Sequence, residues 1–251
     1  MANKTALVTG GSRGLGKNMA ITLAKKGIDV VLTYNSSKEQ AAKVVEEIKL
    51  LGQKAVAFQL DTSNISAFDN FINQLTEYLQ SENGNPKFDF LVNNAGVALY
   101  ALAKDTTEEQ LDNIFNIHFK GVFFLIQKSL AFINDNGAII NVSAGLARIV
   151  APGFSVYGSL KGAIEIYTRY LAKELGERKI RANVIEPGAI ETDFGGGYSQ
   201  DKETNAQIAS ATPLGRVGLP NDIGGVVAFL CTQEAYWING QRIGVSGGQV
   251  L

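Results

Sequence analysis

The sequence has almost none of the residues that build disulfides and metal centres, because it contains one cysteine, Cys231, and one histidine, His118. One cysteine excludes an intrachain disulfide and a cysteine-rich metal site, and it indicates a reducing, cytoplasmic compartment. We therefore expect no metal ion. The chain also lacks an apolar signal core, and no uncharged apolar run approaches the ~18 residues of a membrane span, so we expect no membrane attachment.

An excess of charge of one sign is also missing. Lys and Arg number 23 and Asp and Glu number 24, which leaves a formal net charge of −1. Without a basic excess, neither nucleic acid nor an anionic lipid surface is an expected partner. Hydrophobic residues make up 45% of the 251 positions, which is enough for a buried core and too many for a disordered chain.

Short apolar runs alternate with amphipathic stretches along the chain, a pattern typical of parallel strands joined by helices. We predict an α/β fold: a single doubly wound parallel sheet of the Rossmann type with helices on both faces. One domain is expected over residues 1–251, with a polar, glycine-rich lid over 188–211. The expected strands cover 4–9, 29–34, 54–60, 88–92, 138–142, 180–185 and 242–245. The first expected helix follows the glycine turn and ends near 26, and another begins near 64. The remaining three expected helices cover about 37–52, 107–132 and 155–176.

Three local patterns refine these boundaries. Ser37 with Gln40, and Thr107 with Gln110, have the spacing of capping boxes, in which two side chains satisfy the first N–H groups of a helix. The polar stretch 81–86 is expected to be a surface loop.

Glycine is abundant, with 27 residues, and one group of glycines follows the first expected strand. The run Thr9–Gly16 places glycines at 10, 14 and 16. Turns without side chains let backbone N–H groups and a helix N-terminus approach a pyrophosphate, so the run indicates a dinucleotide site. A tight connection without a ligand is the alternative, but the position between a strand and a helix is what dinucleotide binding requires.

Polar or glycine-bearing residues follow four of the expected strands: Asp61, Asn93–Gly96, Ser143 and Pro187–Gly188. In an open parallel sheet, the ligand crevice lies beyond the carboxyl ends of the strands. Each of these residues taken singly can be a turn or a cap. Four of them at one edge favour a binding site.

Tyr157 and Lys161 lie four residues apart at the start of an expected helix, and therefore on one face of it. An ordinary surface pair is one interpretation. The other is a phenol made acidic by the ammonium group, since two charges ~4 Å apart interact by about 4 kcal/mol at an effective dielectric constant near 20. We therefore expect the pKa of Tyr157 to fall towards neutrality.

Two further patterns carry no function in our interpretation. Gly244–Gly248 matches the G-x-S-x-G nucleophile elbow, but only three residues follow it and the histidine lies far upstream, so a serine hydrolase is excluded. His118 has no second ligand of its kind and is expected to be a packed or surface residue.

Thr9–Gly16, Asn93–Gly96, Ser143, Tyr157-x-x-x-Lys161 and Pro187–Gly188 together resemble the short-chain dehydrogenase/reductase family, in order and in spacing, from Lys4 to the last residues. The subgroup resembled is that of bacterial NADP-dependent ketone and 3-oxoacyl reductases. The resemblance implies a catalytic tetrad of Asn116, Ser143, Tyr157 and Lys161, hydride transfer with Tyr157 as general acid, and a homotetramer. It assigns cofactor binding to Gly10, Ser12, Arg13, Gly14, Leu15, Gly16, Asn35, Ser36, Ser37, Asp61, Thr62, Asn93, Ala95, Gly96, Tyr157, Lys161, Pro187, Gly188, Ile190 and Thr192.

Two residues depart from the pattern of this family. Glu186 stands before the Pro-Gly pair, where a small residue is usual, and Ser246 stands before the last Gly-Gly pair, where an aspartate is usual. Neither belongs to the tetrad, but Glu186 leaves the charge near the cofactor crevice open.

The expected cofactor is NADP(H), with NAD(H) the weaker alternative. NAD enzymes place a carboxylate after the second strand, and this sequence has no acid between Val30 and Lys38. Asn35–Ser37 stand there instead, and Arg13, in the glycine turn, can form a bidentate hydrogen bond to a 2′-phosphate.

We expect a small ketone or alcohol as substrate, because 97–102, 145–154 and the lid around Phe194 and Tyr198 are largely apolar. Two alternatives stay open: a 3-oxoacyl-acyl-carrier-protein reductase and a catalytically silent nucleotide-binding protein. The segment 131–136 has one acid and no base, which disfavours docking of an acidic carrier, although Arg178 can still provide one contact. The complete tetrad disfavours a silent protein.

Overall fold

Seven strands form one sheet in the computed structural model, which describes residues 3–249. The strand order is β3-β2-β1-β4-β5-β6-β7, and every neighbouring pair is parallel. This is the doubly wound, Rossmann-type sheet predicted from the sequence. The strands are β1 (Thr5–Val8), β2 (Asp29–Tyr34), β3 (Ala55–Gln59), β4 (Phe88–Asn93), β5 (Ile133–Val142), β6 (Arg181–Pro187) and β7 (Arg242–Val245).

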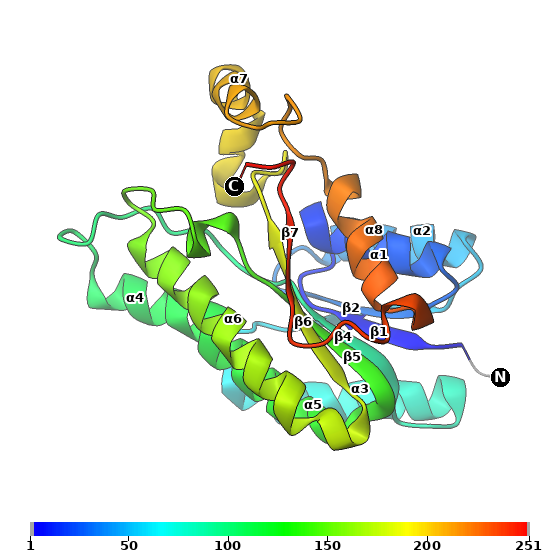
Figure 1. Cartoon of the computed structure of the whole chain (residues 1–251). Helices are drawn as coiled ribbons and strands as arrows, with labels where there is room; N and C mark the ends of the chain where they lie inside the picture. Colours follow the sequence, from blue (N-terminus) through cyan, green and yellow to red (C-terminus); the bar gives the residue numbers. More distant parts are fainter. Residues whose placement is uncertain (1–2, 250–251) are drawn as a thin grey trace.

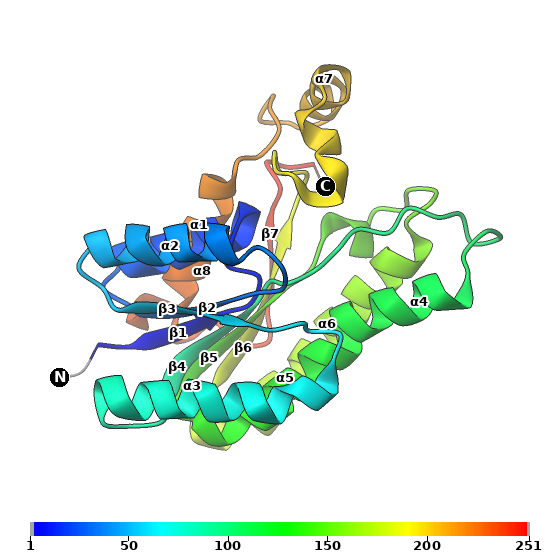
Figure 2. The same cartoon turned by 180° about the vertical axis from the view of Figure 1, so that it is seen from behind.

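Helices cover both faces of the sheet (Figures 1 and 2). On one face lie α1 (Gly14–Lys25), α2 (Lys38–Leu50) and α8 (Pro220–Leu230), and on the other lie α3 (Phe68–Asn83), α5 (Gly121–Ser129) and α6 (Ser155–Glu174). Two further helices, α4 (Glu108–Phe115) and α7 (Lys202–Ser210), lie beyond the carboxyl ends of the strands. No helix among residues 3–249 is long and apolar enough to cross a bilayer.

Strand β1 shows how the sequence produces these layers. Ala6 and Val8 pack into the core beneath α1 and α8, whereas Leu7 points into the core beneath α3 and α5. A strand covered on both faces needs apolar side chains on both of them, which is why Ala6, Leu7 and Val8 form an apolar run. The parallel alignment brings the carboxyl ends of the strands to one edge.

Two boundaries and one helix cap differ from the sequence prediction. Strand β5 begins five residues early, at Ile133, because the chain passes Asn136 in a left-handed conformation (φ 65°) and resumes pairing with β4 at Ala138. Helix α3 continues to Asn83 and ends at Gly84 (φ 68°), so the expected loop begins later. The Ser37–Gln40 capping box is wrong, since the Ser37 side chain caps no N–H group, whereas the box at Thr107 and Gln110 is confirmed.

Two helices were missed by the sequence prediction. Helix α7 occupies 202–210, inside the segment predicted as a lid. Helix α8 begins with Pro220, and its Gly224 and Gly225 hide the helical pattern. Close packing of α8 on α1 explains the glycine at position 224, because a Cβ atom there would overlap Asn18 on α1.

Candidate active site

Ser143, Tyr157 and Lys161 come together at the carboxyl edge of the sheet. Ser143 follows β5, and the other two residues stand in the first turns of α6. All three side chains are buried. The Lys161 Nζ atom lies 5.5 Å from the centroid of the Tyr157 ring and donates to the Val142 carbonyl over 2.8 Å. The Ser143 hydroxyl lies 3.3 Å from the Lys161 carbonyl oxygen and 2.7 Å from a Glu165 carboxylate oxygen.

Burial dominates the electrostatics of Tyr157 and Lys161. It raises the pKa of Tyr157 above its ordinary value, and Tyr198 raises it further. Burial also lowers the pKa of Lys161 from 10.5 to about 7, because Nζ forms no ion pair with any carboxylate among residues 3–249 to offset its lost hydration. The expectation of an acidic phenol is therefore wrong for the protein alone, since a lysine that is largely neutral above pH 7 supplies too little charge.

His118 is a packed residue beside this pair. Its ring meets the Tyr157 ring edge-on, with 5.2 Å between centroids, and its Nε2 atom lies 2.8 Å from the Val97 carbonyl oxygen. Burial, and then the charge of Lys161, lower its pKa to about 3, so the imidazole is neutral at physiological pH. A side chain at Gly96 would come within 2.6 Å of the His118 Cε1 atom, so this glycine makes room for the ring.

Asn116 begins a π-helical turn, Asn116–Lys120, that joins α4 to α5. The expected long helix is therefore continuous but carries one wide turn, a feature often found at functional sites. Gly121 follows the turn, and a Cβ atom there would overlap the Thr62 carbonyl oxygen. The helix thus packs directly on the loop after β3. The Asn116 side chain is half-buried and makes no hydrogen bond to another residue within 3–249.

The glycine turn after β1 has the form that a pyrophosphate site needs. Gly10 (φ 64°) and Gly14 (φ 54°) adopt left-handed conformations, and a Cβ atom at Gly16 would overlap the Gly10 carbonyl oxygen. Helix α1 begins at Gly14 without a side-chain cap, so its first N–H groups are left for a ligand. Ser12 is buried, and Leu15 packs on the core beneath α1.

Thr9 and Asn94 hold this turn in place, and the sequence prediction assigned neither of them a role. The Thr9 hydroxyl oxygen accepts from the backbone N–H groups of Asn94 and Ala95, each over 3.0 Å. The Asn94 amide donates back to the carbonyl oxygens of Thr9 and Gly10 over 3.0 and 3.2 Å. The loop after β4 is thereby fixed against the glycine turn. The placement of both residues in the recognised motifs was the only sequence signal for this contact.

The other residues at the strand ends divide into inward and outward groups. Asn93 is buried, and its amide donates to Asn141 on β5 over 2.8 Å, so its side chain is engaged inside the sheet. Asp61 is exposed and accepts from Ser63. Gly188 lies against Ser246, whose Cα atom is 2.9 Å from where a Cβ atom on Gly188 would stand. Ser246 therefore packs beneath the turn that follows Pro187.

Asn35–Ser37 and Arg13 stand on different elements of the carboxyl edge. Asn35 and Ser36 are exposed after β2, and Ser37 directly precedes α2. Arg13 instead forms an ion pair with Asp193, in the segment predicted as a lid. Thr192, beside it, contacts the position of a Cβ atom on Gly14, and Ile190 bridges to Gly218. The glycine turn is thus tied to 190–193, and also to the end of β2, because the N–H groups of Gly10 and Gly11 donate to the Thr33 hydroxyl and carbonyl oxygens over 3.3 and 2.8 Å.

Aromatic side chains gather around Tyr157. The Phe194 ring centroid is 6.3 Å from that of Tyr157, and Tyr198 is near enough to shift its pKa. Tyr100 packs edge-on against Phe154, and the Ala101 N–H group donates to the Gly153 carbonyl. The loops after β4 and β5 and the segment 188–211 therefore meet next to Tyr157 with apolar surface.

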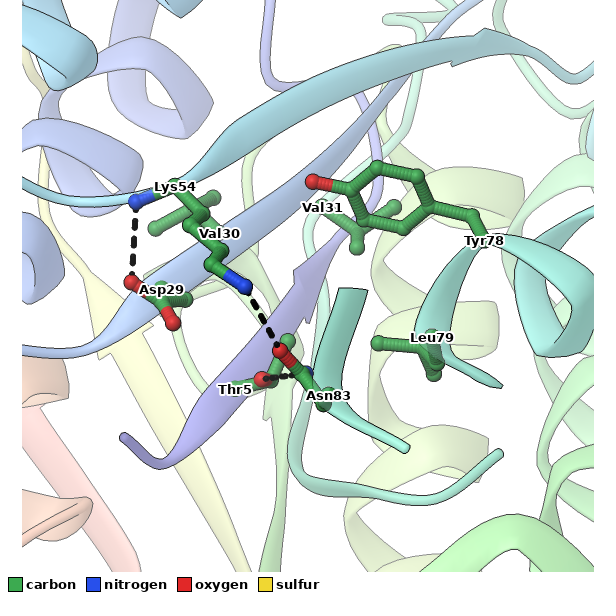
Figure 3. Close-up of a pocket in the computed structure, with 8 residues that line it drawn as sticks. All are labelled: Thr5, Asp29, Val30, Val31, Lys54, Tyr78, Leu79 and Asn83. Carbon is green, nitrogen blue, oxygen red and sulfur yellow. Dashed lines mark hydrogen bonds between the residues drawn. The ribbon is translucent and has the colours of Figure 1, made fainter. Parts of the chain in front are cut away.

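The opposite edge of the sheet holds a small pocket, shown in Figure 3. It lies at the amino ends of β1 and β2 and is closed by internal hydrogen bonds. The Asp29 carboxylate accepts from the Lys54 N–H group over 2.9 Å, and the Asn83 amide donates to the Thr5 hydroxyl over 3.4 Å. These contacts hold α3 and the amino ends of β1 and β2 together, so we assign this pocket a structural role.

Comparison with known proteins extends over nearly the whole chain. A family described as Enoyl-(Acyl carrier protein) reductase matches residues 10–249. A short-chain dehydrogenase/reductase of Pestalotiopsis microspora is 38% identical over 256 aligned positions, which cover 98% of this chain and 94% of that protein. Versicolorin reductase of Emericella nidulans is 36% identical, over 98% of this chain and 95% of its own.

Solved structures show the same likeness. The crystal structure of the angucycline C-6 ketoreductase LanV with bound NADP superimposes with a TM-score of 0.94 at 35% identity, covering 98% of this chain and 95% of LanV.

Gly16→Ala should disturb the glycine turn through lack of space alone. The new methyl group would overlap the Gly10 carbonyl oxygen and lie 2.5 Å from the Asn94 amide nitrogen. We expect the free energy of unfolding to fall by about 1–3 kcal/mol, the usual cost of overpacking, and NADPH binding to weaken. Urea denaturation and cofactor titration measure the two effects. Gly225→Ala on α8 is the control: its methyl group meets no atom within 4 Å, so stability should rise slightly. Equal stability of the two variants would contradict the assigned contact.

Proposed function

Because the chain belongs to the short-chain dehydrogenase/reductase family, we propose that it reduces small or medium-sized uncharged ketones with NADPH, and that it also runs the reverse alcohol oxidation. It is an NADP-dependent oxidoreductase. The observation that carries the finer proposal is the meeting of Ser143, Tyr157 and Lys161 beside an apolar, aromatic surface. A panel of ketones, assayed with NADPH by absorbance at the nicotinamide band, tests it.

The chain around the glycine turn fits a dinucleotide. Left-handed glycines, the absence of room for a side chain at Gly16 and an uncapped helix N-terminus leave backbone N–H groups for a pyrophosphate. We assign the cofactor-binding role to this turn and to the following residues at the ends of the other strands: Asp61, Thr62, Asn93, Ala95, Gly96, Pro187, Gly188, Ile190 and Thr192. When bound, NADPH supplies the hydride that reaches the carbonyl carbon.

Tyr157 is the general acid in this proposal. Its raised pKa keeps the phenol protonated at neutral pH, which is the form that must donate to the alkoxide oxygen. Ser143 donates a hydrogen bond to the same oxygen and positions it. Lys161 binds the nicotinamide ribose. Asn116, at the π-helical turn, holds a water molecule that links Lys161 to solvent. The segment 188–211 acts as a lid in a single domain over 1–251.

NADP(H) is the cofactor, and the loop after β2 explains the preference. No acid lies between Val30 and Lys38 to repel a 2′-phosphate. Asn35 and Ser36 are exposed there, ahead of the N-terminus of α2, a favourable place for a dianion. We propose that Arg13 turns from Asp193 towards the 2′-phosphate when the cofactor binds, since its side chain is 67% exposed.

Docking of an acidic carrier protein is disfavoured by the contacts of Arg178. Its Nε atom pairs with Asp135 over 2.9 Å, and its other nitrogens donate to the carbonyls of Leu130 and Ile133. This arginine is engaged with the start of β5. We therefore favour reduction of free ketones over reduction of a 3-oxoacyl group bound to the acyl carrier protein.

We further propose that the protein is a homotetramer that works in the cytoplasm. Aromatic rings form a continuous stack across α4, α5 and α6, with 5.8 Å between Phe115 and Phe119 and 4.8 Å between Phe123 and Tyr167. Beside this stack, Leu111, Ile166 and Tyr170 are 44%, 47% and 63% exposed. The edge strand β7 and Trp237, which is 99% exposed, offer a second contact surface.

Ile166→Glu places a charge on the first of these surfaces, so sedimentation of this variant should show dissociation of the tetramer. Leu50→Glu on α2, outside both surfaces, is the control and should leave the assembly intact.

Tyr157→Phe should lower kcat by several orders of magnitude while NADPH still binds, because the ring remains and only the acid is lost. Steady-state kinetics with a reactive ketone and a separate NADPH titration measure this. Tyr170→Phe, on the exposed side of the same helix, is the control and should retain activity. More than about a tenth of wild-type activity in Tyr157→Phe would rule out its assigned role.

Arg13→Glu should raise KM for NADPH about tenfold or more, a cost of ~1.4 kcal/mol, and leave KM for NADH nearly unchanged. Arg13→Glu also removes the ion pair with Asp193, and this loss should change KM for NADPH and for NADH alike. Asp193→Asn removes the same ion pair while keeping Arg13, so it measures that contribution alone. Equal losses of Arg13→Glu with NADPH and NADH would show that Arg13 does not read the 2′-phosphate.

A further inference from the structure

His118 is the one histidine of the chain, and the proposed reaction gives it no part. It stands on the π-helical turn Asn116–Lys120, which packs against α6, the helix that carries Tyr157. His118 is 2% exposed, whereas Asn116 on the same turn is half-buried. The wide turn therefore brings a polar ring into the interior beside the proposed acid.

The ring of His118 is fitted into the loop after β4. A Cβ atom at Gly96 would lie 2.6 Å from the ring Cε1 atom and 3.4 Å from each ring nitrogen, so the edge that carries both nitrogens faces this loop. The Nε2 atom lies 2.8 Å from the Val97 carbonyl oxygen and 3.2 Å from the Val97 nitrogen. Gly96 ends the loop that we assign to the cofactor, and Val97 begins the apolar segment that we assign to the substrate. His118 thus binds the loop where these two parts meet.

The contacts of the ring favour one tautomer. A neutral imidazole has one N–H group and one lone pair in the ring plane. The Nε2 atom can therefore donate to the Val97 carbonyl or accept from the Val97 N–H group, and the carbonyl oxygen is nearer. The Nδ1 atom is buried and has no hydrogen-bond partner among residues 3–249. A proton on Nδ1 would leave a buried N–H group unpaired, which is rare in folded proteins. The proton therefore belongs on Nε2, which donates to Val97.

The surroundings of the ring keep it neutral. Burial, and then the charge of Lys161, lower the pKa of His118, and the contact with Val97 opposes this only in part. An imidazolium ion would place a second cation in the interior next to Lys161, the charged side chain that faces the ring from α6. The hydrogen bond to Val97 is therefore the same throughout the mild pH range.

The same ring also contacts the proposed acid. It meets the Tyr157 ring edge-on, with 5.2 Å between centroids and 81° between the ring planes. Phe194, in the segment 188–211, contacts the Tyr157 ring as well, with 6.3 Å between centroids. Edge-on aromatic contacts have a preferred geometry and limit how a ring can turn. His118 belongs to the body of the fold, so its contact does not depend on the position of the lid.

We propose that His118 is a positioning residue for the reduction: its Nε2–H group fixes it to Val97 and its ring holds Tyr157, so that the acid keeps its place relative to the loop that carries the cofactor. The inference rests on the proposed ketone reduction with Tyr157 as general acid. Both features of the side chain are needed, because phenylalanine has the ring without the donor and asparagine has a donor without the ring.

Two substitutions test the two features separately. His118→Phe keeps a ring beside Tyr157 but cannot donate to Val97, and His118→Asn keeps an amide donor but removes the ring. In each variant kcat should fall at least about tenfold, because a displacement of about 1 Å in a reacting group can cost on the order of 100-fold. NADPH affinity should stay close to wild type, since the glycine turn is untouched. Expressing kcat per NADPH-binding site, titrated directly, separates this effect from a loss of folded protein. Lys120→Gln, exposed on the same turn, is the control and should follow wild type.

A measurement without substrate tests the placement of the ring itself. Because the chain has one histidine, protein labelled with ¹⁵N-histidine gives one pair of ring nitrogen signals in NMR. We expect the neutral Nε2–H pattern from about pH 5 to pH 8, the range in which an ordinary histidine titrates. A titrating ring, the Nδ1–H tautomer, or wild-type kcat in either variant would overturn the inference. If the neutral Nε2–H pattern is found but the wild-type protein reduces no ketone, the placement of His118 is supported and the proposed function fails.

Discussion

All seven strands run in the same direction, and most features of this protein depend on that constraint. Parallel strands leave their carboxyl ends at one edge, so the glycine turn after β1, the Asn93–Gly96 loop, Ser143 and the turn at Gly188 become neighbours although they are far apart in the chain. The contacts between these loops are made largely by backbone groups and small residues. The Thr9 hydroxyl and the Asn94 amide join two loops directly, and Gly96 admits the ring of His118, which packs on Tyr157.

Burial of charge is the second organising fact. Lys161 and Glu186 are both buried, and neither has enough compensating partners, so the pKa of the first falls and that of the second rises. Each shift brings the group closer to its neutral form. The two shifts lie on either side of Ser143, which contacts the Lys161 carbonyl directly and Glu186 through Glu165 and Arg242.

The sequence was sufficient for the sheet, for every helix on its two faces except α8, and for the residues at its carboxyl edge, because these follow from apolar runs and glycine placement. It was insufficient where tertiary contacts decide. Ser37 precedes a helix yet caps nothing, and α8 forms despite Gly224 and Gly225 because its packing on α1 requires a small residue. The prediction of a lowered pKa for Tyr157 was wrong, because the distance between Tyr157 and Lys161 can be estimated from their spacing in the sequence, whereas the depth at which they are buried cannot. Glu165 gave no signal, since its contacts with Ser143 and with Arg242 on β7 arise only in the folded chain.

The contact between Gly96 and His118 has a consequence for how this chain can change over time. The ring fills the space that a side chain at position 96 would need, and the ring in turn supports Tyr157 from the side. A larger residue at 96 is accepted only after the ring at 118 has been replaced by something smaller. A smaller residue at 118 leaves Tyr157 less supported until another group fills the gap. The two positions are therefore coupled in their substitution history, and the order of changes matters as much as their identity.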